Sequence, residues 1–185
     1  FYPTKNLGSL GEGGMVLTSD RAVAEYVASY RNYGQEGRYN HIMKGSNFRI
    51  NAVQCMVLDT KLKKLDKFIQ KRRWIAEKYI NELSEINGLA IGEFDHTSAY
   101  HLFVIRVRDG KRNELKSYLS DNDIDALIHY PTSIPEQPCY RDEYHEIQLK
   151  KTDRFQEEIL SLPCYPFLTE DEQNEIIQKI KIFFL

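Results

Sequence analysis

The sequence of 185 residues has few of the features that mark a disulfide-rich or membrane-spanning protein. Its three cysteines are Cys55, Cys139 and Cys164, and their odd number and wide spacing argue against a disulfide framework. Reduced thiols are typical of a reducing compartment, so we expect a cytoplasmic protein. No apolar run approaches the ~20 residues that a membrane-spanning helix needs, and we expect no membrane partner.

The sequence also has little excess of charge of one sign. The chain has 25 basic and 27 acidic residues and a formal net charge of −2, which gives no support for binding to the polyanionic backbone of nucleic acids. It contains no P-loop and no histidine, cysteine and aspartate cluster with metal-ligand spacing, so we expect no bound metal. The hydrophobic content of 42% is typical of a globular domain with its own core.

What the sequence does contain begins with Lys5, in the stretch F-Y-P-T-K-N-L-G that leads into G-E-G-G at positions 11–14. Pro3 fixes its own φ angle, and the glycines permit close backbone approaches. A lysine amine held on such a loop can form a Schiff base with an aldehyde cofactor. A solvated surface lysine is the common alternative, because most lysines lie at the surface.

Four further stretches place polar or aromatic residues in loops or at the ends of elements. They read R-N-Y-G-Q-E-G-R-Y-N-H at 31–41, G-S-N-F-R-I-N-A-V-Q at 45–54, H-Y-P at 129–131 and S-L-P-C-Y-P at 161–166. The first is typical of a glycine-broken connector. The second is typical of the start of a helix, with Asn51 as its N-cap.

Taken together, these stretches resemble the motifs of the DegT/DnrJ/EryC1/StrS family of pyridoxal-phosphate-dependent nucleotide-sugar aminotransferases. The family patterns are S-F-x-P-x-K-x-L-G-x-x-G-[DE]-G-G, R-N-Y-G-x-x-G-[RK]-Y-x-H, G-x-N-x-R-[LM]-x-x-x-Q, H-Y-P-x-P-x-H-x-Q-P-x-Y and S-L-P-[ILMC]-x-P. The resemblance covers essentially the whole chain. Two positions differ, because Ser133 replaces the usual second proline and Pro135 stands where a second histidine is common.

The resemblance implies an α/β protein of the fold-type I pyridoxal-phosphate-dependent transferases. Residues 1–50 would be the end of the large cofactor-binding domain, residues 51–86 a long linking helix, and residues 87–185 the small C-terminal α/β domain. The family's first half, and the serine that precedes the position of Phe1, are not in this sequence. We therefore expect a C-terminal portion that neither binds the cofactor tightly nor turns over by itself.

The same resemblance implies roles for residues at the cofactor. Lys5 would hold pyridoxal 5′-phosphate and then act as a general acid and base. Asn47 would bind the phosphate of the cofactor in the other subunit of a homodimer. Arg38 and Tyr39 would reach from the neighbouring subunit to the phosphates of the nucleotide sugar, a task that suits the planar guanidinium fork.

Two more residues follow from the H-Y-P stretch. The resemblance implies that His129 and Tyr130 line the mouth of the active site and touch the substrate. His129 has a structural alternative, in which it only hydrogen-bonds the loop that follows it. The common second histidine of the family is absent at Pro135, so a sugar contact by that residue is not expected here.

The implied activity is the transfer of an amino group, from glutamate, to a keto group of a UDP- or dTDP-linked sugar in amino-sugar or polysaccharide biosynthesis. One alternative is a non-catalytic regulatory or structural member of the same fold. Another is the branch of pyridoxal-phosphate-dependent sugar dehydratases, which carries histidine where Lys5 stands. The presence of Lys5, Asn47 and His129 favours the aminotransferase.

Hydrophobic periodicity predicts the local structure. We expect a β-α-β unit of parallel strands over residues 101–128, which would place His129 at the carboxyl end of a strand, where ligands gather in such units. We also expect a buried strand at 15–18 and a helix at 20–31 capped by Ser19. A long helix is expected over 51–86, with Lys71 as the candidate position for a break and Asn87-Gly88 as its close. The last two expected helices are one at 152–160 capped by Thr152 and one that opens with a capping box at Thr169.

Overall fold

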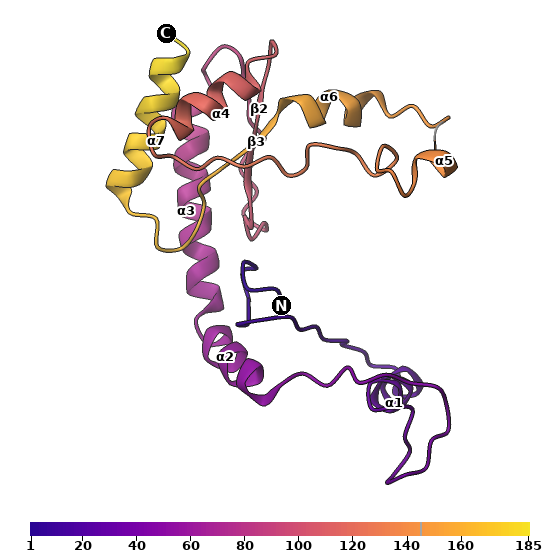
Figure 1. Ribbon diagram of the computed structural model, residues 1–185. Helices are drawn as coiled ribbons and strands as arrows, with labels where there is room; N and C mark the ends of the chain where they lie inside the picture. Colours follow the sequence, from indigo (N-terminus) through magenta and orange to yellow (C-terminus); the bar gives the residue numbers. More distant parts are fainter. Residues whose placement is uncertain (145) are drawn as a thin grey trace. The chain divides into compact units, whose positions relative to one another are not determined.

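The computed structural model describes residues 1–144 and 146–185, which form two compact units, Phe1–Asp66 and Lys67–Leu185 (Figure 1). The boundary between the units falls inside the segment 51–86. His145, which the sequence places at a solvated surface, lies outside the described residues. Across the described ranges, no helix combines the length and the apolar character that crossing a membrane requires.

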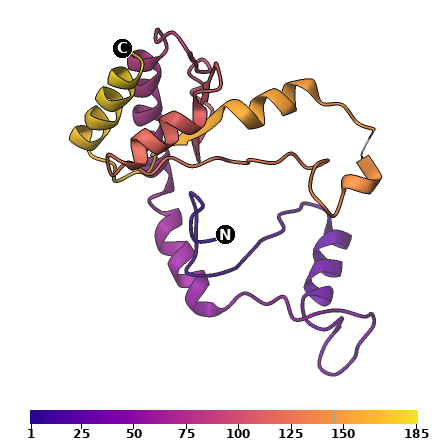
Figure 2. The ribbon, with the colours of Figure 1, turned by 45° about the horizontal axis from the view of Figure 1, so that its top comes forward.

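The first unit contains two capped helices joined by long loops. Helix α1 spans Arg21–Tyr30 and helix α2 spans Ala52–Leu62 (Figure 2). The carboxylate of Asp20 caps α1 by accepting hydrogen bonds from two backbone N–H groups, so the prediction of Ser19 as the cap was wrong by one residue. Asn51 caps α2 as predicted.

The buried strand predicted at residues 15–18 does not form. Met15, Val16 and Leu17 are exposed, and Leu17 has 86% of its surface accessible. A strand requires a neighbour that takes up its backbone N–H and C=O groups. In the described part of the chain, no strand pairs with this segment. The apolar run is therefore a strand sequence without a pairing partner.

The helix predicted over residues 51–86 is two helices. After α2 the chain passes through Lys63 and Lys64 before helix α3, which spans Leu65–Leu83. The backbone N–H of Lys64 bonds to the carbonyl three residues earlier, a tighter turn than that of an α-helix. The break predicted near Lys71 was therefore wrong, because the helix interruption lies at this lysine pair.

The second unit contains a three-stranded antiparallel sheet in the order β1-β2-β3. Strand β1 spans Leu89–Ala90, β2 spans Phe103–Val107 and β3 spans Ile159–Leu162. The central strand β2 confirms the strand predicted there. Gly88 precedes β1 with a φ of 97°, beyond the end of α3, so it shapes a turn and does not cap the helix.

The predicted β-α-β unit of parallel strands was wrong. Residues 124–128 do not form a strand; Leu127 makes a single antiparallel bridge with Ser161. Strand β3 lies beside β2 and pairs with it through four residue pairs. Strand pairing joins residues that are distant in sequence, so local periodicity could not identify this neighbour. His129 consequently follows a bridge to an antiparallel strand.

The described residues of the second unit also form helices α4 at Arg112–Ser120, α5 at Arg141–Tyr144, α6 at Lys150–Glu158 and α7 at Glu170–Phe183. Helix α6 begins before Thr152 and ends where β3 begins, so the predicted cap and end of this helix were wrong. The capping box at the start of α7 is confirmed.

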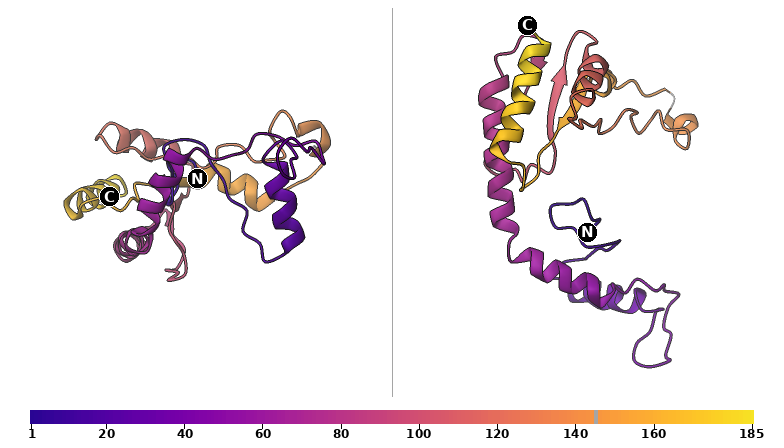
Figure 3. Two further views of the ribbon diagram at one scale, coloured as in Figure 1. Left: turned by 90° about the horizontal axis from the view of Figure 1, so that it is seen from below. Right: turned by 60° about the vertical axis from the view of Figure 1, so that its left-hand side comes forward.

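One face of the sheet carries the core of the second unit. Helices α3 and α7 run side by side along this face (Figure 3). Phe103, Ile105 and Val107 of β2 are buried, whereas Val104 between them is 39% exposed, as the alternation of a strand requires. Tyr79 of α3 is fully buried, and its ring centre lies 5.0 Å from that of Phe103. The core thus joins one sheet face to the flanking helices.

A buried arginine ties α3 to two other segments of the unit. Nη1 of Arg72 donates hydrogen bonds to the carbonyl oxygens of Tyr100, His101 and Cys164. Burial lowers the pKa of the Arg72 guanidinium and raises the pKa of the Cys164 thiol to about 11. The cysteine is therefore a neutral, buried side chain at physiological pH.

Candidate cofactor and substrate site

Lys5 lies on a loop that closes on itself through backbone contacts. Its backbone N–H bonds to the carbonyl of Tyr2 at 2.9 Å, and the N–H of Ser9 bonds to the carbonyl of Phe1 at 2.9 Å. Gly8 packs so closely on the carbonyl of Pro3 that a Cβ there would collide with it. The ordered backbone leaves the Lys5 side chain exposed, which suits an amine that must meet an aldehyde.

Asn47 lies in a hairpin-like loop that follows α1. It forms an antiparallel bridge with Asn32, and the loop is closed by a hydrogen bond from the N–H of Tyr33 to the carbonyl of Ser46. A Cβ on Gly45 would collide with backbone atoms of this crossing, so only glycine fits. The Asn47 side chain is exposed, and an exposed amide is a suitable donor to a phosphate oxygen.

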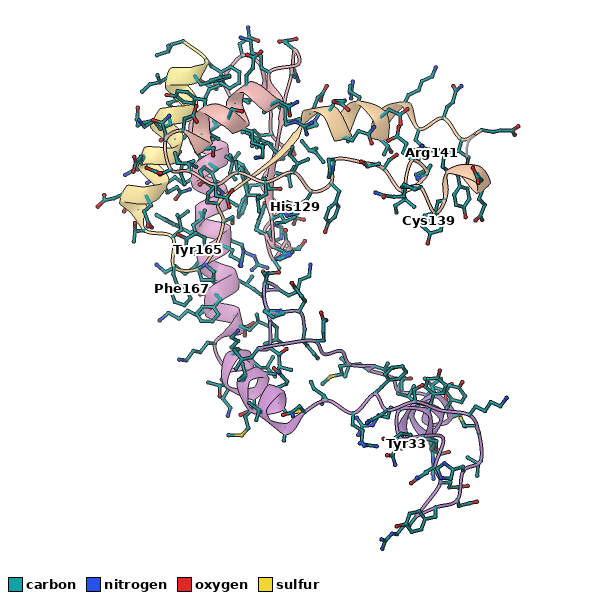
Figure 4. The ribbon with its side chains drawn as sticks, viewed as in Figure 1. Tyr33, His129, Cys139, Arg141, Tyr165 and Phe167 are labelled. Atoms are coloured by element: carbon teal, nitrogen blue, oxygen red, sulfur yellow. The ribbon has the colours of Figure 1, made fainter. Side chains whose placement is uncertain are left out.

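Arg38 and Tyr39 lie at the exposed end of the same loop. Nη2 of Arg38 donates to the Tyr39 hydroxyl at 3.0 Å, and Tyr39 is 75% exposed. At the base of the loop, Nδ1 of His41 is 2.9 Å from the carbonyl oxygen of Tyr33, the residue labelled in Figure 4. A basic and an aromatic side chain therefore project together from a loop whose base is fixed.

His129 lies in the second unit (Figure 4), on the sheet face opposite the core. Its Nδ1 is 2.9 Å from Oγ of Ser161, a buried residue of β3. Ser161 lies opposite the exposed Val104, whereas its neighbours Leu160 and Leu162 belong to the core. The ring of Tyr130 meets that of His129 edge-on with 5.5 Å between centres. Tyr130 itself is 68% exposed.

The structure brings the predicted site residues together in pairs. Arg38 contacts Tyr39 in the first unit, and His129 contacts Tyr130 in the second. The roles assigned to these residues, and to Lys5, stay predictions. Among residues 1–144 and 146–185 there is no group of three or more histidine, cysteine, aspartate or glutamate side chains that could hold a metal ion.

The sequence reasoning missed three residues that hold the candidate side chains in place. Ser161 bonds to His129; it was the first residue of the S-L-P stretch, but no strand was predicted there. Gln54 and Lys61 of α2 bond to the loop that carries Lys5. Gln54 belonged to a recognised motif, but the sequence did not show which group it bonds to. Lys61 resembled Lys63 and Lys64, which follow it closely in sequence and are exposed.

Curated relatives match nearly all of this chain. It is 38% identical over 184 residues to the erythromycin biosynthesis sensory transduction protein EryC1 of Saccharopolyspora erythraea, covering 98% of this chain and 50% of that protein. It is 36% identical over 184 residues to the dTDP-3-amino-3,4,6-trideoxy-α-D-glucose transaminase of Streptomyces venezuelae, covering 98% and 48%. The chain spans about half the length of the curated relatives it matches.

Solved structures extend the similarity to the fold. Streptomyces venezuelae DesV, in complex with a ketimine intermediate, matches with a TM-score of 0.93 and 34% identity over 99% of this chain and 50% of that one. NtdA of Bacillus subtilis, with bound cofactor PMP, matches with a TM-score of 0.92 and 25% identity over 100% and 44%. The predicted fold class, part of an α/β pyridoxal-phosphate-dependent transferase, is confirmed.

The chain also matches the model of one protein family over nearly its whole length. Residues 1–181 match the DegT/DnrJ/EryC1/StrS aminotransferase family. The aminotransferases of this family and the solved neighbours depend on pyridoxal phosphate. The resemblance read from the five motifs is thereby confirmed, and the chain belongs to the DegT/DnrJ/EryC1/StrS aminotransferase family.

Proposed function

We propose that the protein to which this chain belongs is an aminotransferase that moves an amino group from glutamate to a keto group of a nucleotide-linked sugar. The observation that carries the proposal is Lys5, exposed on an ordered loop, in a chain whose relatives include a dTDP-sugar transaminase. The relatives' activity favours a catalytic protein over a non-catalytic member of the fold. Lys5 itself argues against the dehydratase branch.

Pyridoxal 5′-phosphate would supply an aldehyde for the lysine amine and an electron sink for the loss of a proton from the amino donor. Lys5 would hold this group through Nζ and, once released by the donor, would carry the proton on the same nitrogen. Asn47 would donate its side-chain amide to the cofactor phosphate. These residues fit the group, because an exposed amine and an exposed amide are the donors that its aldehyde and phosphate need.

The proposal extends to the substrate and the assembly. Arg38 and Tyr39 would bind the phosphates of the sugar nucleotide from a neighbouring subunit, and His129 with Tyr130 would line the mouth of the site. We propose a homodimer with shared sites, acting in the cytoplasm in amino-sugar or polysaccharide biosynthesis. The three cysteines, none of which is in a disulfide bond in the described chain, support that location.

The test is an absorbance spectrum of the intact protein with pyridoxal phosphate, before and after glutamate is added. The wild type and Lys67→Ala, which alters an exposed lysine of α3, should show the band of a lysine adduct that changes with glutamate. Lys5→Ala should lack this adduct and lose activity by more than about a thousandfold, because the covalent link and the proton carrier are removed together. A wild-type protein that binds no cofactor would overturn the proposal.

The shared site has a test of its own. In a mixture of Lys5→Ala and Asn47→Leu protomers, one site of each hybrid dimer would contain a wild-type Lys5 and a wild-type Asn47. Activity should therefore return in the mixture although each variant is inactive alone. Continued inactivity of proven hybrid dimers would show that the two residues serve the same subunit.

A further inference from the structure

Two side chains of α2 bond to the loop that carries Lys5. The backbone N–H of Leu10 donates to Oε1 of Gln54 at 2.7 Å, and Nζ of Lys61 donates to the carbonyl of Gly8 at 2.7 Å. Positions 54 and 61 lie about two helical turns apart, so their side chains leave the same face of the helix. Leu58 lies between them on this face and is the buried residue of α2. One helix face therefore contacts the loop at two polar points.

The loop has its own internal order, which makes these two contacts effective. Ser9 is 1% exposed, and its Oγ donates to the carbonyl of Phe1 at 2.9 Å. Gly8 is also buried, and its carbonyl is the group that Lys61 binds. Because the loop backbone is closed on itself, fixing residues 8 and 10 against α2 also fixes the turn from which the Lys5 side chain leaves.

Within this chain, apolar contacts give the loop little further support. Tyr2 is 50% exposed and Leu10 is 68% exposed, so neither anchors the loop by burial. A hydrogen bond from an ammonium group is stronger than one between neutral groups, and its loss would leave the buried carbonyl of Gly8 without this partner. Lys61 also lies in the last turn of α2, where a positive charge is favoured by the helix dipole.

We propose that Gln54 and Lys61 are positioning residues that set the place of the Lys5 amine, without touching substrate or cofactor. This inference rests on the proposed function of Lys5. Proton transfer by an amine requires reacting atoms within roughly 3–3.5 Å of each other, and a loop that shifts by about 1 Å loses much of the rate. The clamp formed by Gln54 and Lys61 supplies this restraint through polar contacts.

The experiment compares Lys61, in the last turn of α2, with Lys63, the C-cap residue of α2, in the intact protein. Lys61→Met keeps the length of the side chain but removes the donor, and Lys61→Arg keeps a donor. The matched control is Lys63→Met, because Lys63 is exposed and bonds to Asp59 at 2.6 Å on the surface of α2. Amide hydrogen exchange of residues 5–10 is measured without cofactor, and kcat and KM for glutamate are measured with it.

Lys61→Met should accelerate exchange in the loop about tenfold and lower kcat about tenfold, with KM for glutamate within about twofold of wild type. Lys61→Arg should restore most of both effects, and Lys63→Met should behave as wild type. Gln54→Leu should accelerate exchange at the Leu10 amide in the same way, and it serves as the test if Lys61→Met does not fold.

Equal exchange and equal kcat in Lys61→Met and Lys63→Met would overturn the inference, as would a loss of kcat without a change in loop exchange. The failure of the proposed function is distinguishable from both outcomes. It would appear as a wild-type protein without a cofactor band, whereas loop exchange reports the clamp in either case.

Discussion

The two units of the chain differ in how much apolar surface they bury. Among the residues that the structure describes, Leu58 is the buried apolar side chain of the first unit, and the remaining ones form a core in residues 67–185. The first unit relies on helix caps, backbone bridges and close approaches at glycines such as Gly8 and Gly45. Within this chain, which spans about half the length of the relatives it matches, the second unit has an apolar core and the first is held mainly by polar contacts.

The candidate functional residues are also divided between the two units. Lys5, Asn47, Arg38 and Tyr39 all lie in the unit with little core, on loops whose side chains are exposed. His129 lies in the unit with the core, but on the sheet face away from it. Within this chain, the candidate functional groups of the first unit are exposed, and hydrogen bonds hold the loops that carry them.

The largest expected effect tests the contrast in burial directly. Ile105→Ala removes a fully buried side chain from β2 and should lower the free energy of unfolding by about 3 kcal/mol. Leu17→Ala, at an exposed position of the first unit, should change it by less than about 0.5 kcal/mol in this chain. Urea unfolding of both variants measures the difference. Similar values for the two would show that Leu17 is buried in solution.

The next effect concerns adjacent arginines of α3. Arg72→Met removes a buried guanidinium that bonds to three carbonyl groups and should cost about 2 kcal/mol of unfolding free energy. Arg73→Met is the control, because Arg73 bonds to the carbonyl of Ser98 at 2.8 Å from a less buried position, and it should cost under about 1 kcal/mol. If Arg73→Met proved the costlier variant, the buried clamp would not be a main support of the second unit.

A smaller effect is expected where the second unit holds a functional candidate. Ser161→Ala removes the hydroxyl partner of His129 Nδ1 and should cost about 1 kcal/mol of unfolding free energy. It should also change the tautomer balance of the His129 ring, because that hydrogen bond selects the protonated nitrogen. Nitrogen chemical shifts of the imidazole measure the change, and shifts identical to those of wild type would contradict the assigned contact.

The smallest effect is expected at the N-terminus of α7, and it depends on pH. The backbone N–H and the hydroxyl of Thr169 both donate hydrogen bonds to the Glu172 carboxylate. These bonds lower the pKa of Glu172, and the bond from the backbone N–H has the larger effect. The stabilisation is present above the unfolded pKa of about 4.3 and is lost as the pH falls through the lower folded value. Thermal unfolding of wild type and Glu172→Gln should therefore differ at pH 7 and converge in acid. A constant difference would assign the effect to packing.

Local features of the fold could be predicted from the sequence because they depend on neighbouring residues. The cap of α2 by Asn51 and the capping box at Thr169 are examples, since each side chain bonds to backbone atoms within three residues. The pairing of β2 with β3 joins residues more than fifty positions apart, and residues 159–160 were assigned to a helix. Strand neighbours are selected by tertiary contacts that local periodicity does not contain.

The candidate site could also be predicted from the sequence only in part. Motif letters identified Lys5 and His129, because their neighbours in sequence are distinctive. Their hydrogen-bonding environment could not be predicted, since Gln54, Lys61 and Ser161 come from distant segments. Lys61 and Lys63 look equivalent in sequence, yet one binds a buried carbonyl and the other an exposed carboxylate. The direction of each side chain around the helix decides between them.

Helix α2 is therefore sensitive to the insertion or deletion of a single residue. Each residue rotates an α-helix by about 100°, so one residue added between positions 54 and 61 would turn Lys61 away from the Gly8 carbonyl while Gln54 kept its bond. An insertion after Lys61, at the turn before α3, would leave both bonds in place. We therefore expect relatives of this protein to show few length changes between positions 54 and 61.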